Sequence, residues 1–198
     1  MSVLTAEPRL DHLLAAVEAR YNHAKTLQVL FQEQYTRAGE PRRTESGVLM
    51  LRKPGRMRWD YSQPKGKLFV ADGKYLYLYT PDDNRAERMK LQMTDDMRAP
   101  LAFLLGKLHF SKEFRNIQAK PEGADARITA EPQGDNLPYS AVEFLVASDG
   151  RIREVKVTGF DKSVLDFHFD QEKVDPAFNA GLFEFQLPPG AQWTEGEQ

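Results

Sequence analysis

The sequence predicts a mainly β fold with short helices, an α+β chain built largely from antiparallel strands. Apolar and aromatic residues alternate with other residues at a period of two over most of the chain, which is typical of β-strands. Turn-forming pairs such as Pro54-Gly55 and Asp72-Gly73 separate these segments. Apolar residues recur at helical spacing in only two stretches. The chain of 198 residues has the length of one β-rich domain, and we expect a single domain over residues 1–198.

Composition and charge exclude several classes of function. The sequence is 41% hydrophobic, enough for a substantial core, and its 27 basic and 29 acidic residues give a net charge of −2. This balance predicts neither a nucleic-acid partner nor an anionic-membrane surface. Cysteine is absent, so disulfides, thiolate metal sites and cysteine nucleophiles are excluded. No apolar run approaches the roughly 18 residues of a membrane span.

The N-terminal segment predicts a helix but no secretory signal. The first residues, MSVLTAEP, are too short and too polar for a signal peptide. The chain is therefore expected to be cytoplasmic, or to be secreted with its signal already removed. Apolar residues at helical spacing then predict a helix over about residues 8–25. We expect its apolar stripe, with Leu13, Leu14 and Val17, to line a hydrophobic cavity; a helix that simply fills the core of a sheet is the alternative.

The central stretch, residues 47–79, predicts a meander of strands that is apolar on both faces. Leu76 and Leu78 alternate with three tyrosines, so neither face of that strand is polar. A sheet that is apolar on both faces must cover the second one with another layer or with a ligand. Within the meander we expect the following residues to line a hydrophobic cavity: Met57, Trp59, Tyr61, Leu68 and Val70.

A second short helix is expected over about residues 97–107. Its apolar residues recur at helical spacing, and Gly106 is a typical stop signal. Because this helix is too short to be stable alone, it must be held by what it covers. We expect it to act as a lid over the cavity through Leu101, Phe103, Leu104 and Leu105.

The second half of the chain again predicts strands. Glycine-containing turns separate them, for example Ser148-Asp149-Gly150. A turn or short 3₁₀ segment is expected over residues 175–182, and a last strand begins at Phe183 and Phe185. The other strands are predicted over residues 114–119, 126–130, 141–146, 151–158 and 164–169.

Catalytic and metal-binding patterns are not visible in the sequence. The four histidines, His12, His23, His109 and His168, share no ligand-like spacing. Ser62 to Lys65 match the S-x-x-K nucleophile motif, but that motif needs a helix, and Pro64 places the pair in a hairpin. No glycine-rich loop joins a strand to a helix. We therefore predict no enzyme, no cofactor and no metal site.

Several local motifs follow one another in a distinctive order. They are Phe31-Gln32 and Gln34 after the helix, Lys53-Pro54-Gly55 before Arg58-Trp59, Val70-Ala71-Asp72-Gly73-Lys74, Pro100-Leu101 with Leu104-Leu105, the Asp149-Gly150 turn, and Phe183-Glu184-Phe185 before Pro188-Pro189-Gly190. In this order they resemble a known family, the outer-membrane lipoprotein carriers (LolA-type), over nearly the whole chain. The resemblance implies an incomplete, strongly curved antiparallel β-barrel with helices covering its concave apolar face.

The same resemblance implies a periplasmic, non-enzymatic carrier. Its cargo would be the acyl chains of lipoproteins or lipids. It would receive them from an inner-membrane ABC transporter that releases lipoproteins and deliver them to an outer-membrane lipoprotein acceptor. We expect it to act as a monomer. The alternatives are a lipid- or lipoprotein-sensing or scaffold module with the same half-barrel, and an enzyme acting on a lipid.

One position departs from the family's pattern. An arginine before the proline helps to hold the helical lid shut in the best-known members, whereas Lys53 precedes Pro54 here. Lysine donates hydrogen bonds but lacks the planar fork of arginine. The resemblance therefore suggests Lys53 as the lid lock, and an ordinary solvated lysine at a turn is the alternative.

Overall fold

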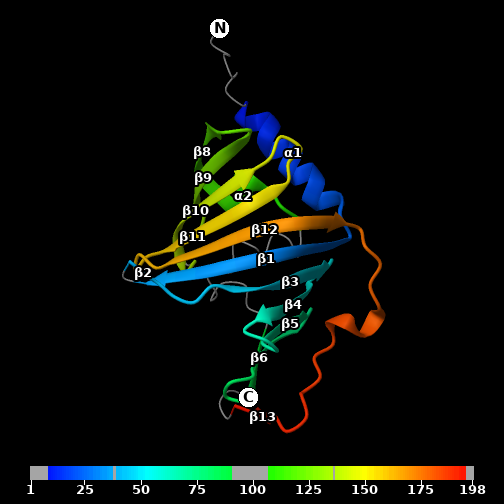
Figure 1. The fold of residues 1–198 in the computed structure, drawn as a ribbon. Coiled ribbons are helices and arrows are strands. Elements are labelled where there is room, and N and C mark those ends of the chain that lie inside the picture. The colour runs from blue at the N-terminus through cyan, green and yellow to red at the C-terminus, as the bar shows by residue number, and fades with distance from the viewer. Residues whose placement is uncertain (1–8, 38, 91–106, 136, 195–198) are drawn as a thin grey trace.

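The computed structural model describes residues 9–37, 39–90, 107–135 and 137–194. They form a helix and one long, strongly curved sheet, followed by a C-terminal segment that returns along the sheet (Figure 1). The elements are α1 (Leu10–His23), β1 (Thr26–Arg37), β2 (Glu40–Pro41), β3 (Glu45–Arg52), β4 (Arg56–Gln63), β5 (Leu68–Asp72), β6 (Tyr75–Thr80), β7 (Arg85–Lys90), α2 (Phe110–Glu113), β8 (Phe114–Glu122), β9 (Asp125–Pro132), β10 (Tyr139–Val146), β11 (Ile152–Gly159), β12 (Val164–Val174), the 3₁₀ helix η2 (Ala180–Phe183) and β13 (Gln192–Trp193).

The described strands belong to one sheet of thirteen. The order along the sheet is β13-β7-β6-β5-β4-β3-β1-β12-β11-β10-β9-β8, and β2 pairs with β1. All pairs are antiparallel except β13 with β7. The strands follow the chain as a meander on either side of β1, which lies between β3 and β12. The predicted open, strongly curved antiparallel sheet is thus confirmed.

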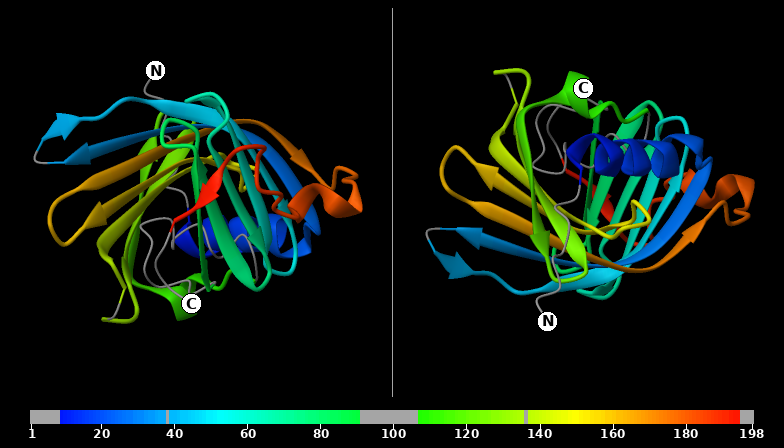
Figure 2. Two further views of the ribbon diagram at one scale, coloured as in Figure 1. Left: turned by 90° about the horizontal axis from the view of Figure 1, so that it is seen from below. Right: turned by 90° about the horizontal axis from the view of Figure 1, so that it is seen from above.

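The sheet curls around α1, which lies across its concave side (Figure 2). Period-two alternation sends one set of side chains from each strand to this side. β1 supplies Leu27, Val29 and Phe31, and 29 buried apolar residues from α1, the strands and the segment around α2 form one contiguous cluster. Gly47 makes room within it, since a side chain there would collide with the Asp60 carbonyl, 2.0 Å from an added Cβ. The core of the protein is therefore the space between α1 and the concave face.

The predicted helix over residues 8–25 is present as Leu10–His23, whereas the predicted last strand is wrong. Phe183 ends the 3₁₀ helix η2, and Phe185 lies in extended chain that pairs with no strand in the described structure. The alternation of Phe183 and Phe185 resembles a strand, but these side chains pack onto the sheet from outside. β12 also continues five residues beyond the predicted 164–169, because its partner β1 is equally long.

The C-terminal segment covers the second apolar face of the central meander. η2 lies against β4 and β5, and Phe183 is only 1% exposed. Arg52 donates to the Phe178 carbonyl at 2.7 Å, and its guanidinium lies 5.1 Å from the centre of the Phe183 ring. Further along, Phe185 stacks on Tyr77 with ring centres 4.9 Å apart. The covering layer expected for this meander is therefore the chain's own C-terminus.

Candidate functional site

The candidate site is the apolar interior between α1 and the concave face, centred on Trp59. This side chain is fully buried and contacts the rings of Phe31, at 4.6 Å between centres, and Phe167, at 5.5 Å. Tyr61 packs edge-on against Phe31 at 5.1 Å. β4 supplies Met57, Trp59 and Tyr61 to this face because they alternate along the strand, as expected from the sequence.

Two of the predicted lining residues lie on the wrong face. Directly opposed residues on neighbouring strands share a face, and Trp59 stands opposite Phe69. Leu68 and Val70 stand opposite Asp60 and Arg58, on the outer side. The prediction that Leu68 and Val70 join Trp59 is therefore wrong. Phe69 and Ala71 lie on the concave face instead, because the β4–β5 turn sets the register of the two strands. The alternating sequence pattern was compatible with either face of β5.

α1 presents its predicted apolar stripe to this interior. Leu13, Val17 and Tyr21 are buried in the cluster, and Leu14 packs against it from a partly exposed position. The spacing of four residues between Leu13, Val17 and Tyr21 places them on one side of the helix. This arrangement makes α1 the cover of the concave face within the described structure.

The C-terminal half of α1 is anchored by a buried polar cluster on β11 and β12. The Tyr21 hydroxyl donates to Glu172 at 2.6 Å and accepts from the Ile152 amide at 2.9 Å. Arg20 forms an ion pair with Glu172, whose side chain is only 4% exposed, at 2.6 Å. Burial and the neighbouring Glu172 carboxylate raise the pKa of Tyr21 well above 10.0. The hydroxyl therefore stays protonated and able to donate.

Lys53 anchors the same end of α1 from the other half of the sheet. Its ammonium donates to the carbonyl of Tyr21, in the last turn of the helix. The last four carbonyls of a helix lack partners within it, and a cation at this end also complements the helix dipole. Burial lowers the pKa of Lys53 from 10.5. Lys53 thus contacts the covering helix, as the resemblance suggested, and its part in any lid movement stays a prediction.

α1 is also fastened to the segment that leads into α2. Asn22 exchanges two hydrogen bonds with Leu108, donating to its carbonyl at 2.7 Å and accepting from its amide at 2.6 Å. Glu18 accepts from the Phe110 amide at 2.8 Å. On the opposite side Gly150, at φ +80°, lies so close that an added Cβ would be 2.6 Å from the Ala16 carbonyl oxygen. The sequence did not predict these contacts of Glu18 and Asn22, because polar residues are expected on the exposed side of any amphipathic helix.

The predicted lid helix over residues 97–107, with Leu101, Phe103, Leu104 and Leu105, lies outside the described residues except for Lys107. The segment that follows it is part of the core. Leu108 is fully buried, and Phe110 packs edge-on against Phe144 with ring centres 5.6 Å apart. The chain therefore lies in the interior at Leu108 and Phe110.

The described structure shows no candidate catalytic or metal centre. Over residues 9–37, 39–90, 107–135 and 137–194, no group of three or more histidine, aspartate or glutamate side chains could hold a metal ion. Ser62 and Lys65 lie at the end of β4 and in the following turn, so the S-x-x-K match has no helix to align it. In the same residues, no helix is long and apolar enough to cross a membrane.

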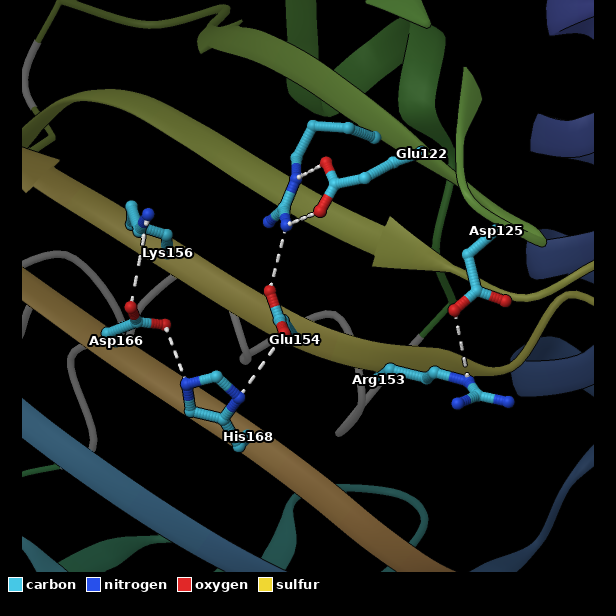
Figure 3. A network of polar contacts seen from close by, with 8 residues as sticks. Glu122, Asp125, Arg153, Glu154, Lys156, Asp166 and His168 are labelled. Atoms are coloured by element: carbon cyan, nitrogen blue, oxygen red, sulfur yellow. Dashed lines mark hydrogen bonds and ion pairs between the residues drawn. The ribbon is translucent and has the colours of Figure 1, made fainter. Parts of the chain in front are cut away.

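The outer face of β9, β11 and β12 carries a chain of ion pairs, which Figure 3 shows from close by. Arg127 joins Glu122 at 2.6 Å and Glu154 at 2.9 Å. His168 lies between Glu154, at 3.3 Å, and Asp166, at 3.7 Å. These side chains pair with one another at the surface and face away from the apolar interior. We assign this network no part in the candidate site.

Together, the fold and the site define a half-barrel whose apolar concave face is closed by a helix. Comparison with protein families then identifies the family. The model of the outer membrane lipoprotein carrier protein LolA matches residues 22–186, and the chain belongs to this family. An outer-membrane lipoprotein carrier protein of Chromobacterium violaceum is 27% identical over 97% of this chain and 92% of its own length. One from Nitrosomonas europaea is 26% identical over 75% and 71%.

Solved structures share the fold at low sequence identity. An uncharacterised conserved protein of Thermus thermophilus matches with a TM-score of 0.55 and 15% identity, over 93% of this chain and 97% of its own. A DUF1329 family protein of Desulfovibrio piger matches with a TM-score of 0.52 and 12% identity, over 90% and 98%. The Pseudomonas aeruginosa MucA/MucB complex matches with a TM-score of 0.50 and 13% identity, over 89% and 61%. These likenesses show the fold alone.

Proposed function

We propose that the protein is a periplasmic carrier that holds the acyl chains of lipoproteins between α1 and the concave face. The observation that carries this proposal is the apolar interior closed by a single described helix, in a chain of the LolA family. An inner-membrane ABC transporter would load it, and an outer-membrane acceptor would unload it. The protein has no catalytic role in this proposal, since binding of acyl chains needs shape and apolar surface.

In this proposal part of α1 leaves the sheet to admit cargo, because Leu13, Val17 and Tyr21 occupy the concave face in the described structure. Burying an acyl chain is worth roughly 0.8 kcal/mol per CH₂, so a chain of ordinary length contributes on the order of 10 kcal/mol. Lifting Leu13 and the partly buried Leu14 costs about 2–5 kcal/mol, at roughly 1.5–3 kcal/mol for a fully buried side chain. The exchange is favourable and remains reversible when a more apolar acceptor competes for the chain.

We infer that α1 opens from its N-terminal end. In the described structure, the first two turns of the helix make no hydrogen bond or ion pair with the sheet and are held by the apolar contacts of Leu13 and Leu14. Complete undocking would also break the ion pair between Arg20 and the buried Glu172, a cost that adds to the loss of the apolar contacts. The C-terminal half therefore serves as the hinge, next to its covalent connection to β1.

Binding is tested with a triacylated lipopeptide and the same peptide without acyl chains. In a Trp193→Phe background the remaining tryptophan is Trp59, and its emission should shift only with the acylated peptide. Native mass spectrometry of the same mixture should show the lipopeptide bound. An unchanged spectrum together with no bound mass at saturating lipopeptide would overturn the carrier proposal.

The hinge is tested by thiol labelling, which the cysteine-free chain allows without background. Leu13→Cys should react at least about tenfold faster than Val17→Cys, because only the first two turns open frequently. Ala15→Cys, on the exposed side, gives the unprotected rate, and denaturant unfolding verifies that the variants are equally folded. Equal rates for Leu13→Cys and Val17→Cys would mean that the helix leaves as one unit.

The second candidate is a sensing or scaffold module that uses the same half-barrel. One structural neighbour is a complex of two proteins, MucA and MucB, so the fold is compatible with a protein partner. An assay of lipopeptide transfer between vesicles distinguishes the carrier from the sensing or scaffold module. A carrier moves a labelled lipopeptide from one vesicle population to another, whereas a sensor binds the lipopeptide without transferring it. Hydrolysis of an acyl ester during the same assay would indicate an enzyme instead.

A further inference from the structure

The tip of the β11–β12 hairpin exposes a phenylalanine. Phe160 is 68% exposed, the highest value among the exposed large hydrophobic side chains of the described structure. Its turn is tightly bonded: the Gly159 amide donates to the Ser163 carbonyl at 2.8 Å, and the Lys162 amide to the Gly159 carbonyl at 3.1 Å. Asp161 accepts from the Ser163 amide at 3.0 Å and from its hydroxyl at 2.5 Å. The ring is thus held outward by an ordered turn.

Exposed basic side chains lie on the neighbouring hairpin and on the segment that follows it. β1 pairs with β12 as far as Thr36 and Val164, and the β1–β2 and β11–β12 hairpins project side by side (Figure 2). The exposed cations at these tips are Arg37, Arg42, Arg43 and Lys162. None of them lies within ion-pair distance of a described carboxylate, although Arg37 helps to lower the pKa of Asp161 and the Arg43 guanidinium lies against the Gln63 side-chain amide. The nearby carboxylates are Glu40 and Asp161, and Asp161 is engaged in closing its own turn.

We propose that these five residues, Arg37, Arg42, Arg43, Phe160 and Lys162, here called the basic tip, dock the protein on an anionic phospholipid surface. Phe160 enters the boundary between head groups and acyl chains, and the cations bind the phosphates. Docking rests on the proposed carrier function, since a carrier exchanges its cargo at a membrane. The supporting observations are the exposure of Phe160, the bonded turn that holds its ring outward, and the positive charge of the neighbouring residues.

The chemistry of the basic tip favours a lipid over a protein partner. A protein interface needs a contiguous, well-packed apolar centre, and the residues after Phe160 at the apex are Asp161 and Lys162. One projecting ring within a group of cations fits a fluid interface that closes around it. Arginine binds phosphate with two parallel hydrogen bonds, and its stem can lie along apolar surface. The net charge of −2 conceals this patch, because acidic residues are spread over the rest of the chain.

Vesicle flotation tests the docking. The full chain should float with vesicles of phosphatidylethanolamine and phosphatidylglycerol and remain in the bottom fraction with phosphatidylcholine. Each basic residue near an anionic surface contributes about a fivefold factor, so Arg42→Ala with Arg43→Ala should weaken binding about tenfold or more and reduce its salt dependence. Phe160→Ser should weaken it by a similar factor. Arg85→Ala with Lys90→Ala, two exposed cations on β7, is the matched control and should change little.

Insertion of the ring is tested with a polarity-sensitive dye. The dye on Phe160→Cys should shift to the blue when anionic vesicles are added, and the dye on Trp193→Cys, a 46% exposed position on β13, should not. Three results would overturn the proposal: no flotation of the unaltered protein, flotation unaffected by both tip variants, or a shift at position 193 in place of 160. Capture of an acidic protein domain without vesicle binding would assign the tip to a protein partner instead.

The two proposals fail separately. Lipopeptide binding without vesicles involves Trp59 and α1, so Phe160→Ser should leave it unchanged. A protein that floats with anionic vesicles but binds no lipopeptide would overturn the carrier function and retain the docking surface. A protein that binds lipopeptide but does not float with anionic vesicles would overturn the docking surface and retain the carrier function.

Discussion

The outer faces of the two halves of the sheet differ, although one continuous ladder of strands forms both. The covered half, β3–β7, presents Met50, Val70 and Tyr77 outward; Met50 and Val70 are buried, and Phe185 stacks on the partly exposed Tyr77. In the open half, β8–β12, the outer positions carry a chain of ion pairs in contact with solvent (Figure 3).

This difference shows that the outer polarity of a strand reveals whether another layer lies over it. Both halves need the same apolar concave side, since both enclose the core. In the covered half, apolar residues on the outer face of β5 and β6 lie beside the Arg58–Asp60 ion pair of β4, and η2 packs over β4 and β5. The open half gains little stability from its surface charges, because exposed ion pairs are typically worth less than about 1 kcal/mol each.

Removing the main covering side chain should have the largest effect. Phe183→Ala should lower the free energy of unfolding by about 3–5 kcal/mol, because it leaves a cavity over β4 and β5. In a chain of this length, that corresponds to a fall in Tm of roughly 6–20 °C. Phe160→Ala, in the open half, is the matched control and should change Tm very little. Similar losses for the two variants would contradict the division of the outer face.

The next test asks which half holds α1 more firmly. Glu172→Gln removes the charge from the buried partner of Arg20 and Tyr21 and should cost about 1–3 kcal/mol, since Arg20 is partly exposed. Lys53→Leu should cost about 1 kcal/mol or less, because solvent screens its bond and leucine relieves the burial of a charge. Urea unfolding of the two variants gives the order. A larger loss for Lys53→Leu would make the covered half the main anchor.

Transfer assays address Lys53 as a lid lock. If its bond to Tyr21 holds α1 closed, Lys53→Leu should speed lipopeptide transfer by roughly tenfold, equivalent to about 1.4 kcal/mol. Lys53→Arg should slow it, because arginine restores the family's residue with more donors. Indistinguishable transfer rates for the three proteins would leave Lys53 as a purely structural residue.

The two anchors should also differ in their response to alkaline pH. Burial lowers the pKa of Lys53 below 10.5, so between its folded and unfolded pKa values the folded protein binds fewer protons there, and the free energy of unfolding rises with pH. The pKa of Tyr21 is raised well above 10.0, so beyond pH 10 the unfolded chain loses that proton first and the free energy of unfolding falls. Unfolding measured from pH 8 to 11 should show a weaker alkaline loss in Tyr21→Phe. An unchanged slope would contradict the buried hydroxyl.

The smallest effect is expected in the open half. Glu154→Gln should lower the free energy of unfolding by less than about 1 kcal/mol, and salt should diminish even that difference. Thermal unfolding at low and high salt measures it. A loss comparable to that of Phe183→Ala would show that the ion-pair chain is a structural element of the sheet.

The sequence by itself determined most of the strands, the first helix and the resemblance to the family. Period-two alternation in β4 identified Met57, Trp59 and Tyr61 as one face, and helical spacing identified Leu13 and Val17, because such periodicities follow from local backbone geometry. The absence of cysteine and of ligand-like histidine spacing directed the prediction towards an apolar interior. These conclusions depend only on residues close together along the chain.

The tertiary structure decided which face each strand presents and what lies against it. Leu68 with Val70 and Phe69 with Ala71 both fit the period-two pattern of an apolar strand face. Only the register across the β4–β5 turn places Phe69 and Ala71 on the concave face. Phe183 and Phe185 show the alternation of a strand in the sequence. In the structure they instead pack on the outer side of the covered half. Tyr21, Lys53 and Glu172 come from α1, the β3–β4 turn and β12, and only the pairing of β1 between β3 and β12 brings them together. These contacts join residues 32 and 151 positions apart, so no local pattern contains them.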